Sequence, residues 1–322
     1  MSSLDLKEVL EFCIDLARKA GAEINAGSEK RLREQTAIDT KLNTADLVTE
    51  TDQAVEKLVM EAIKAKYPSH KFIGEESYSA GEKAELTDEP TWICDPIDGT
   101  TNFTRADFPF TCISIGFVYK TQPVIGVVYA PRLDHLYYGL SGQGSFLVSP
   151  HFKEPRKLPL TQPLPLPSLR QALMALEWGS LRDRATMEKK LGFFERLVGD
   201  GDDGVKGGQM LQGVRSLGSA ALNFSQVGGG TLDAYHEIGV WSWDVCAGIV
   251  IAREAGAVVI GAKSELSKID EPEFFDSITP EVLQGRKYLV VRAIADTPEE
   301  KGRDAQKRII KAIYGALDEW EP

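Results

Sequence analysis

The chain is organised around residues 95–103, which read Asp95-Pro96-Ile97-Asp98-Gly99-Thr100-Thr101-Asn102-Phe103. Two carboxylates three residues apart follow the apolar run 92–94, which predicts the end of a buried strand. Pro96 and Gly99 are turn residues, so we expect both acids on one exposed loop. Carboxylates are ligands for Mg²⁺, and the backbone N–H groups of Gly99 and Thr100 could hold a phosphate. Taken alone, the segment is much more typical of an ordinary Asp-rich turn than of a metal site.

Two further acidic segments favour the functional interpretation. Glu75 follows the short apolar stretch 72–73, and Asp244 opens a strongly apolar helical run. With these segments in this order, the chain resembles the inositol monophosphatase family, within the Mg²⁺-dependent, lithium-sensitive sugar and nucleotide phosphatases. The signatures are Gly74-Glu75-Glu76-Ser77, the nine residues 95–103, Trp243-Asp244 with Ala247-Gly248, and Glu254-Ala255-Gly256.

This resemblance runs from about Leu4 to about Gly256 and implies a specific fold. The pattern of elements alone favours a mixed α/β (α+β) protein. The family resemblance implies a layered α-β-α-β-α sandwich, usually assembled as a homodimer. A fungal inositol monophosphatase or a relative from a quinate-utilisation cluster is one alternative within the family.

Composition favours an acidic globular enzyme. The chain has 322 residues, 43% of them hydrophobic, and a net charge of −11. That charge argues against a nucleic-acid or anionic-membrane partner, because both bind basic patches. We find neither an N-terminal signal nor a membrane span, and we expect four reduced core cysteines in a cytoplasmic protein. The cysteines are Cys13, Cys94, Cys112 and Cys246.

The Pro-rich segment 158–167 divides the chain, because proline can neither continue a helix nor sit in a central strand. We therefore predict an N-terminal α+β half, residues 1–157, with most metal ligands, and a C-terminal α/β half, residues 158–322, within one catalytic unit. Predicted helices are residues 4–20, 54–67, 185–198, 220–228, 245–255 and 299–317. Predicted strands are residues 92–94, 111–119, 124–130 and 136–140, with antiparallel neighbours.

Candidate metal ligands are the acids Glu75, Asp95, Asp98 and Asp244. A two-metal carboxylate site, with ions about 3.5–4 Å apart, can neutralise phosphoryl oxygens and activate a water. The resemblance implies that Asp95 bridges two ions and that the carbonyl of Ile97 joins the ligands, with two or three Mg²⁺ per site. It does not make Glu76 a ligand, and we expect a solvated or supporting charge there.

The candidate catalytic residues are Glu75, Thr100 and Asp52. Glu75 and the Thr100 hydroxyl would orient the attacking water. The resemblance pairs Thr100 with Asp52. An equally good interpretation makes Asp52 the N-cap of the helix starting near residue 54, and both roles are compatible. Lys41, on the same loop as Asp46, could close over the site or simply be solvated.

The substrate contacts follow from the resemblance, which sets the alcohol moiety near Gly218, Ser219 and Ala220. Glu237 matches the acid that contacts ring hydroxyls in inositol-preferring members, and a surface acid at a strand end is the alternative. An oriented carboxylate selects strongly for a hydroxyl-bearing substrate, so we favour a phosphorylated polyol. The full predicted set is Ile97, Asp98, Gly99, Thr100, Gly218, Ser219, Ala220, Glu237 and Asp244.

The favoured function is Mg²⁺-dependent hydrolysis of myo-inositol monophosphate. Alternatives are a sister phosphatase, such as a bisphosphate nucleotidase or fructose-bisphosphatase, and a non-catalytic regulatory or binding member. Bisphosphate nucleotidases usually have Lys-Gly-Phe where this chain has Thr101-Asn102-Phe103, which argues against them. With four histidines and no paired spacing, zinc chemistry is not expected. Residues 199–208 and 263–286 depart from the family and are expected to form an expanded loop and an extension.

Overall fold

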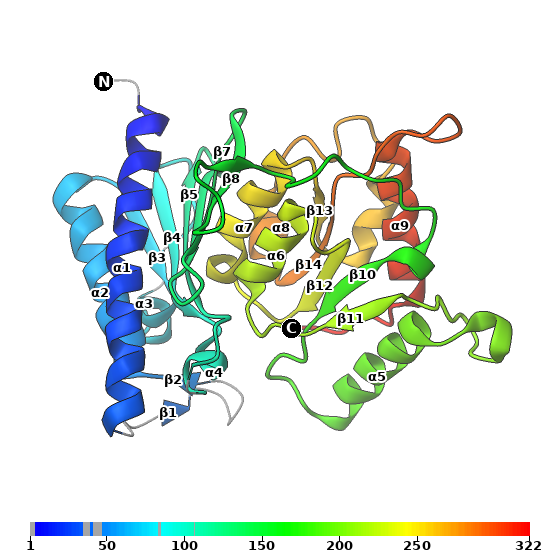
Figure 1. Cartoon of the computed structure of the whole chain (residues 1–322), viewed down its shortest axis with the longest axis horizontal. Coiled ribbons are helices and arrows are strands. Elements are labelled where there is room, and N and C mark those ends of the chain that lie inside the picture. The colour runs from blue at the N-terminus through cyan, green and yellow to red at the C-terminus, as the bar shows by residue number, and fades with distance from the viewer. Residues whose placement is uncertain (1–3, 35–38, 41–46, 83–84, 106) are drawn as a thin grey trace.

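The computed structural model describes residues 4–34, 39–40, 47–82, 85–105 and 107–322. Figure 1 shows five layers, in which helices and sheets alternate. Helices α1 (Leu6–Glu34) and α2 (Glu50–Lys66) cover a seven-stranded sheet, α6 (Ala220–Gly229) and α7 (Ser242–Glu254) fill the middle, and a five-stranded sheet follows. Helices α5 (Arg184–Val198) and α9 (Gly302–Ala316) form the last layer. The expected α-β-α-β-α sandwich is confirmed.

The seven-stranded sheet begins with one parallel pair and continues as an antiparallel meander. Its strands, in spatial order, are β3 (Lys71–Gly74), β4 (Thr91–Asp98), β5 (Cys112–Tyr119), β6 (Gln122–Ala130), β7 (His135–Leu140), β8 (Gly144–Val148) and β9 (Arg156–Lys157). The predicted antiparallel neighbours are confirmed. A separate two-stranded pair joins β1 (Asp39–Thr40) to β2 (Leu47–Val48).

The five-stranded sheet is mixed. Its order is β11 (Gly213–Arg215), β10 (Leu173–Leu176), β12 (Ala234–Ile238), β14 (Lys287–Val291) and β13 (Val258–Ile260). Strand β10 runs parallel to both β11 and β12, so these three strands end at one edge of the sheet. That edge faces the same region as the carboxyl ends of β3 and β4, because residues of β4 and α6 contact each other there.

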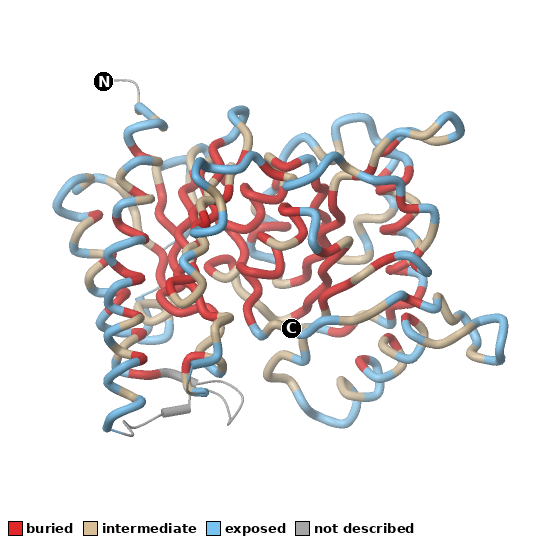
Figure 2. The backbone as a smooth tube through the Cα atoms, viewed as in Figure 1, coloured by how far each residue is buried: buried red, intermediate tan, exposed pale blue. Residues whose placement is uncertain are grey.

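Helix α7 packs closely on the larger sheet through glycines. A Cβ on Gly126 would lie 2.1 Å from the Ala247 carbonyl oxygen, and one on Gly116 would lie 2.4 Å from the Cys246 sulfur. Only glycine therefore allows this approach. Figure 2 shows buried stretches running through both sheets and through α6 and α7, whereas the outer helices are exposed on one side. The four cysteines are buried and unpaired, as expected.

The largest differences between predicted and observed helix bounds are in α1 and α2. Helix α1 continues to Glu34 rather than ending near residue 20. The buried face of the helix continues through Ile24 and Ser28. Gly21 lies within this face and makes room for Tyr129, whose ring would lie 2.4 Å from an added Cβ. Helix α2 begins at Glu50 rather than near residue 54, and its N-cap is Thr49. The N-cap interpretation of Asp52 is therefore wrong, since Asp52 is the N3 residue of a capping box.

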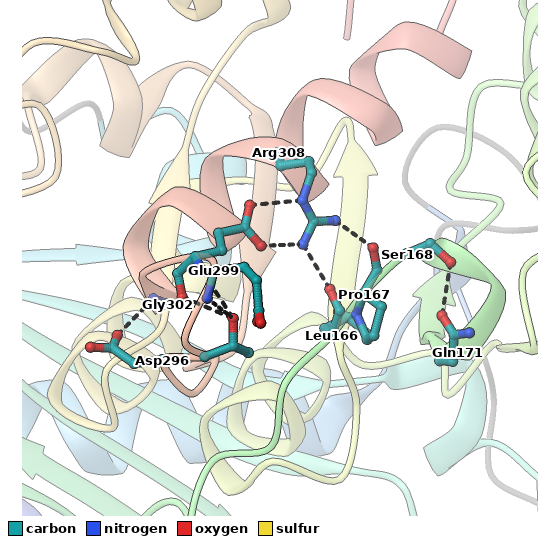
Figure 3. A network of polar contacts seen from close by, with 10 residues as sticks. Leu166, Pro167, Ser168, Gln171, Asp296, Glu299, Gly302 and Arg308 are labelled. Atoms are coloured by element: carbon teal, nitrogen blue, oxygen red, sulfur yellow. Dashed lines mark hydrogen bonds and ion pairs between the residues drawn. The ribbon is translucent and has the colours of Figure 1, made fainter.

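The Pro-rich segment crosses from the first sheet to the second and is fastened to the last helix. Figure 3 shows the Arg308 guanidinium of α9 donating to the carbonyls of Leu166 and Pro167, 3.0 and 2.8 Å away. Glu300 holds the same guanidinium at 2.6 Å. The two sheets lie on either side of this segment, and the division at residues 157/158 into two halves stays a prediction.

Short helices complete the chain. They are α3 (Glu75–Ser79), α4 (Thr100–Phe103), α8 (Pro280–Gln284), η1 (Leu169–Gln171), η2 (Gly201–Asp203) and η3 (Lys263–Lys268). Helix η2 lies within the expected loop 199–208, while η3 and α8 lie within the extension 263–286. In the described part of the chain, no helix combines the length and apolarity needed to cross a bilayer.

Candidate active site

A β-bulge brings Asp95 and Asp98 together. Residues three apart in a regular strand point to opposite faces of the sheet. Here Asp95 pairs with Ser114 and Asp98 with Cys112, so β4 has one residue more than its partner between these pairs. The extra residue allows both carboxylates to lie on one side. The predicted exposed turn is wrong, because Asp95 and Asp98 belong to the strand and are only 2% and 5% exposed.

Asp244 completes a cluster of three acids. It is the N3 residue of α7, and its Oδ2 accepts a hydrogen bond of 2.5 Å from the Trp241 backbone N–H. Oxygen atoms of Asp95, Asp98 and Asp244 all lie within 4.8 Å of one another. The cap fixes the direction of the Asp244 side chain, and the close packing of α7 on the sheet fixes its distance from β4.

The three acids lie close enough together to repel one another. Burial, followed by the charges of Glu75 and Asp244, raises the pKa of Asp95 well above its usual range. Burial and the charge of Asp244 raise the pKa of Asp98 to about 7, although hydrogen bonds from Ser219 and the α6 backbone oppose this shift. Closely spaced carboxylate oxygens are suitable ligands for a hard divalent cation, and its charge would offset the repulsion among the three acids.

Glu75 lies beside this cluster. It is the first residue of α3 and directly follows β3, whose last residue, Gly74, pairs with Cys94 of β4 in parallel register. Glu75 and Asp95 therefore occupy neighbouring positions at the ends of adjacent strands. The neighbouring Glu76 is half-buried and lies outside the three-acid cluster.

A residue that sequence reasoning missed, Glu56, supports the Glu75 turn. The Glu56 carboxylate is 3% exposed and accepts the backbone N–H groups of Glu76 and Ser77, each at 2.7 Å. It also accepts the Ser77 hydroxyl. A Cβ on Gly74 would lie 2.5 Å from the Glu56 carboxyl carbon, so only glycine fits there. The available signal was an acid next to Val55, on the apolar face of α2.

Thr100 is held between Asp52 and Ile97. Its hydroxyl lies 3.3 Å from Asp52 Oδ1 and 3.0 Å from the Ile97 carbonyl oxygen. Asp52 is buried, and its other oxygen accepts the Thr49 backbone N–H at 2.9 Å. Asp52 thus serves the helix cap and contacts Thr100 at once. Gly99 has φ +89°, and a Cβ there would lie 2.8 Å from the Phe110 carbonyl oxygen.

The start of α6 contacts the acid cluster directly. Ser219 is the N-cap of α6, and its hydroxyl donates to Asp98 Oδ2 at 2.5 Å. The N–H groups of Ala220 and Ala221 also point to Asp98, at 3.3 and 2.7 Å. The structure therefore brings two of the predicted alcohol-side residues, Ser219 and Ala220, against a predicted metal ligand.

Glu237 is a buried acid of β12, so the surface-acid alternative is wrong. The Tyr235 hydroxyl donates to its carboxylate. Burial, followed by the charge of Glu177, raises the pKa of Glu237 well above its usual range, and Asp244 and Asp98 add to this. Glu237 is therefore in electrostatic contact with the acid cluster. It also lines a small cavity of about 30 Å³ together with Glu177 and Lys190.

An aromatic wall stands next to Asp244. The rings of Trp241 and Trp243 are stacked 5.1 Å apart, and Tyr78 lies within 5.3 Å of both. The Arg286 guanidinium lies 3.9 Å above the Trp241 ring. Lys41 and Asp46 lie outside the described residues.

Comparison with known proteins gives a consistent result. The model of the inositol monophosphatase family matches residues 5–316. Protein qutG of Emericella nidulans is 40% identical over 96% of this chain and 93% of its own length. Inositol monophosphatase 1 of Bos taurus is 40% identical over 79% of this chain and 83% of its own. The solved inositol monophosphatase of Anabaena (Nostoc) sp. PCC 7120 is 26% identical, with a TM-score of 0.66 over 95% of this chain and 98% of that one.

Proposed function

Because the chain belongs to the inositol monophosphatase family and is a phosphatase, we propose that it hydrolyses a phosphorylated polyol, most specifically myo-inositol monophosphate. The observation that carries the proposal is the buried, oriented Glu237 beside the acid cluster. A carboxylate fixed in this way accepts a hydrogen bond from a substrate hydroxyl and discriminates against esters that lack one.

The proposed cofactor is Mg²⁺, with two or three ions per site. The family is metal-dependent, and the Asp95, Asp98 and Asp244 oxygens form a suitable donor set. Glu75 and the Ile97 carbonyl would complete it. Bound cations neutralise the phosphoryl oxygens and help to activate a water.

The protein groups would orient that water and the phosphate. Thr100 can donate its proton to Asp52, 3.3 Å away, which leaves the hydroxyl oxygen free to accept a proton from the attacking water. Glu75, which follows the neighbouring parallel strand β3, would accept a hydrogen bond from the same water. The N–H groups of Gly99 and Thr100, at the start of α4, would donate to the phosphate.

The alcohol would lie between α6 and β12. Ser219 and Ala220 are fixed against Asp98, and Glu237 is fixed by Tyr235, so ring hydroxyls would meet groups of known orientation. Gly218, with φ +72°, allows the loop before α6 to pass close to the site. These contacts favour a substrate with several hydroxyls over an apolar ester.

The test is phosphate release from a panel of esters, namely inositol 1-phosphate, 3′-phosphoadenosine 5′-phosphate, fructose 1,6-bisphosphate and quinate-like phosphates. Each is measured with Mg²⁺, with EDTA and with lithium. We expect inositol 1-phosphate to be preferred, with EDTA and lithium both inhibiting. Preference for another ester would replace the substrate assignment, and the 40% identity to protein qutG is the reason for including quinate-like phosphates. Polyol binding without turnover would instead support a regulatory role.

We also propose a cytoplasmic homodimer with no nucleic-acid or membrane partner. The acidic composition, with a net charge of −11, supports the absence of an anionic partner. Light scattering on the purified protein tests the dimer, since a mass near that of one 35.4 kDa chain would contradict it.

A further inference from the structure

The loop before α6 is held by Glu177 on one side. Glu177 directly follows β10, and the loop Ser216–Gly218 directly follows the neighbouring parallel strand β11. Glu177 Oε1 accepts the N–H groups of Leu217 and Gly218, at 2.7 and 2.9 Å, and the side-chain amide of Asn223 at 2.9 Å. Its Oε2 accepts the Ser216 hydroxyl at 2.6 Å.

The opposite side of the same loop is held by Asn102. This residue lies in α4, two positions after Thr100, and its amide nitrogen donates to the Leu217 carbonyl at 2.7 Å. The same nitrogen lies 2.8 Å from the Phe110 carbonyl oxygen and 3.4 Å from that of Gly218. One side chain thus binds the N–H groups of the loop, while another binds its carbonyls.

Gly218 and Gly99 allow a close approach between the loop and the segment 95–102. A Cβ on Gly218 would lie 2.9 Å from the Asn102 amide nitrogen, and one on Gly99 would lie 3.0 Å from the Gly218 carbonyl oxygen. Both glycines have positive φ, which favours glycine independently of space. The loop therefore lies directly against this segment.

We propose that Glu177 and Asn102 are positioning residues that fix the loop Ser216–Gly218, and so set how the site receives the alcohol part of its substrate. The inference rests on the proposed function, because it takes Gly218, Ser219, Ala220 and Glu237 as the alcohol contacts. Glu177 binds the loop and also lines the same cavity as Glu237.

A merely structural role predicts a different result. Loss of fold stability lowers turnover of every ester together, whereas loss of loop position raises KM for a polyol ester and spares a small ester without ring hydroxyls. The informative quantity is the ratio of kcat/KM for inositol 1-phosphate to kcat/KM for phenyl phosphate. Both esters use the same phosphate and metal groups.

The experiment measures this ratio and Tm for the variants Glu177→Ala, Glu177→Gln and Asn102→Asp, with Glu188→Gln as control. Glu188 is an exposed acid of α5 that pairs only with Arg184 four residues away among the described contacts. Removing a residue that orients a binding group typically lowers affinity or activity about 10- to 100-fold. We therefore expect Glu177→Ala and Asn102→Asp to lower the ratio by that factor, mainly through KM. The Glu177→Gln variant keeps one side-chain oxygen as an acceptor, so its ratio should stay close to that of the wild-type protein.

Equal losses with both esters, or an unchanged ratio, would overturn the inference. If Glu177→Ala does not fold, the result for Asn102→Asp tests the inference. This substitution keeps the size of the side chain but replaces the amide N–H donor, which faces three carbonyl oxygens, with an acceptor. If the wild-type protein prefers another ester of the panel, the polyol assignment fails. The ratio is then taken between that ester and phenyl phosphate, so the positioning role is still tested separately.

Discussion

Two groups of parallel strands place acids at the candidate site, and they use them differently. In the larger sheet, Glu75 directly follows β3 and Asp95 lies in the last four residues of β4, whereas in the smaller sheet β10 and β12 end near Glu177 and Glu237. Carboxyl ends of neighbouring parallel strands meet at one edge, so both sheets gather acids by the same topology. The chemistry of the gathered acids depends on what surrounds them.

Asp95 of the larger sheet is surrounded mainly by other acids, whereas Glu177 of the smaller sheet is surrounded by hydrogen-bond donors. Asp95 is crowded by Glu75, Asp244 and Asp98, which suits a cation. Glu177 instead accepts four hydrogen bonds, and Glu237 accepts the Tyr235 hydroxyl. The difference supports our proposal that the first group serves phosphate chemistry and the second recognises the alcohol. Mutations in the two groups should therefore separate kcat from KM.

The largest effect is expected for Asp95→Asn. It removes one charge from the centre of the cluster, so we expect kcat to fall by roughly 1,000-fold for every ester. The measurement is Mg²⁺-dependent phosphate release, with Glu76→Gln as the control because Glu76 lies outside the cluster. Full Mg²⁺-dependent turnover by the Asn variant would break the assignment of the larger sheet to metal chemistry.

The next effect tests the smaller sheet. Glu237→Gln weakens a charge-assisted hydrogen bond to a ring hydroxyl, so we expect KM for inositol 1-phosphate to rise about 10- to 100-fold. KM for phenyl phosphate should stay within a factor of about three. The matched control is Glu265→Gln, an acid far along the chain whose side chain serves the Gly261 backbone N–H. A parallel loss with both esters would remove the distinction between the two groups.

A third prediction sharpens the role of Glu56. Glu56→Gln keeps the shape of the side chain but weakens its bonds to the Glu76 and Ser77 N–H groups. We expect kcat to fall about tenfold, as for other supporting residues, with the ratio between esters unchanged. Glu61→Gln, on the exposed side of the same helix, is the control. A changed ratio would mean that Glu56 does not act through Glu75.

The smallest effect concerns stability rather than turnover. His236 is buried among the rings of Phe193, Tyr314 and Trp320, and burial lowers its pKa to about 3. Between pH 6.5 and 3 the unfolded chain binds a proton there that the folded chain does not. The free energy of unfolding therefore loses up to about 1.4 kcal/mol per pH unit below 6.5 through this residue.

His236→Phe should remove that part of the pH dependence. Urea unfolding at pH 7, 6 and 5 measures it, with the exposed His151→Gln as control. If the difference between variant and wild type does not change with pH, His236 is not a neutral buried group. Turnover near neutral pH should change little, which separates this packing residue from its neighbour Glu237.

The sequence pattern predicted a mixed α/β protein and the family resemblance implied its layers. Three of the four predicted metal ligands lie together in the structure, but the detailed geometry that brings them there was not predicted. The apolar periodicity of α2, α5, α6, α7 and α9 located these helices within a few residues, because each buries one face or is buried all round. The exposed turn at 95–98 was wrong, since a bulge is defined by the pairing of β4 with β5 and not by β4 alone. The N-cap assignment to Asp52 was wrong because Thr49 takes that place.

What the sequence determined by itself is the set of chemical groups. The signatures around Glu75, Asp95 and Asp244 identify family and fold, because each is a short run of consecutive residues that can be read directly from the sequence. What only the tertiary structure decided is how those groups are held. Glu56, Glu177 and Asn102 act on backbone groups 20 to 115 residues away. Such contacts have no linear signal, because they exist only where separate strands end side by side.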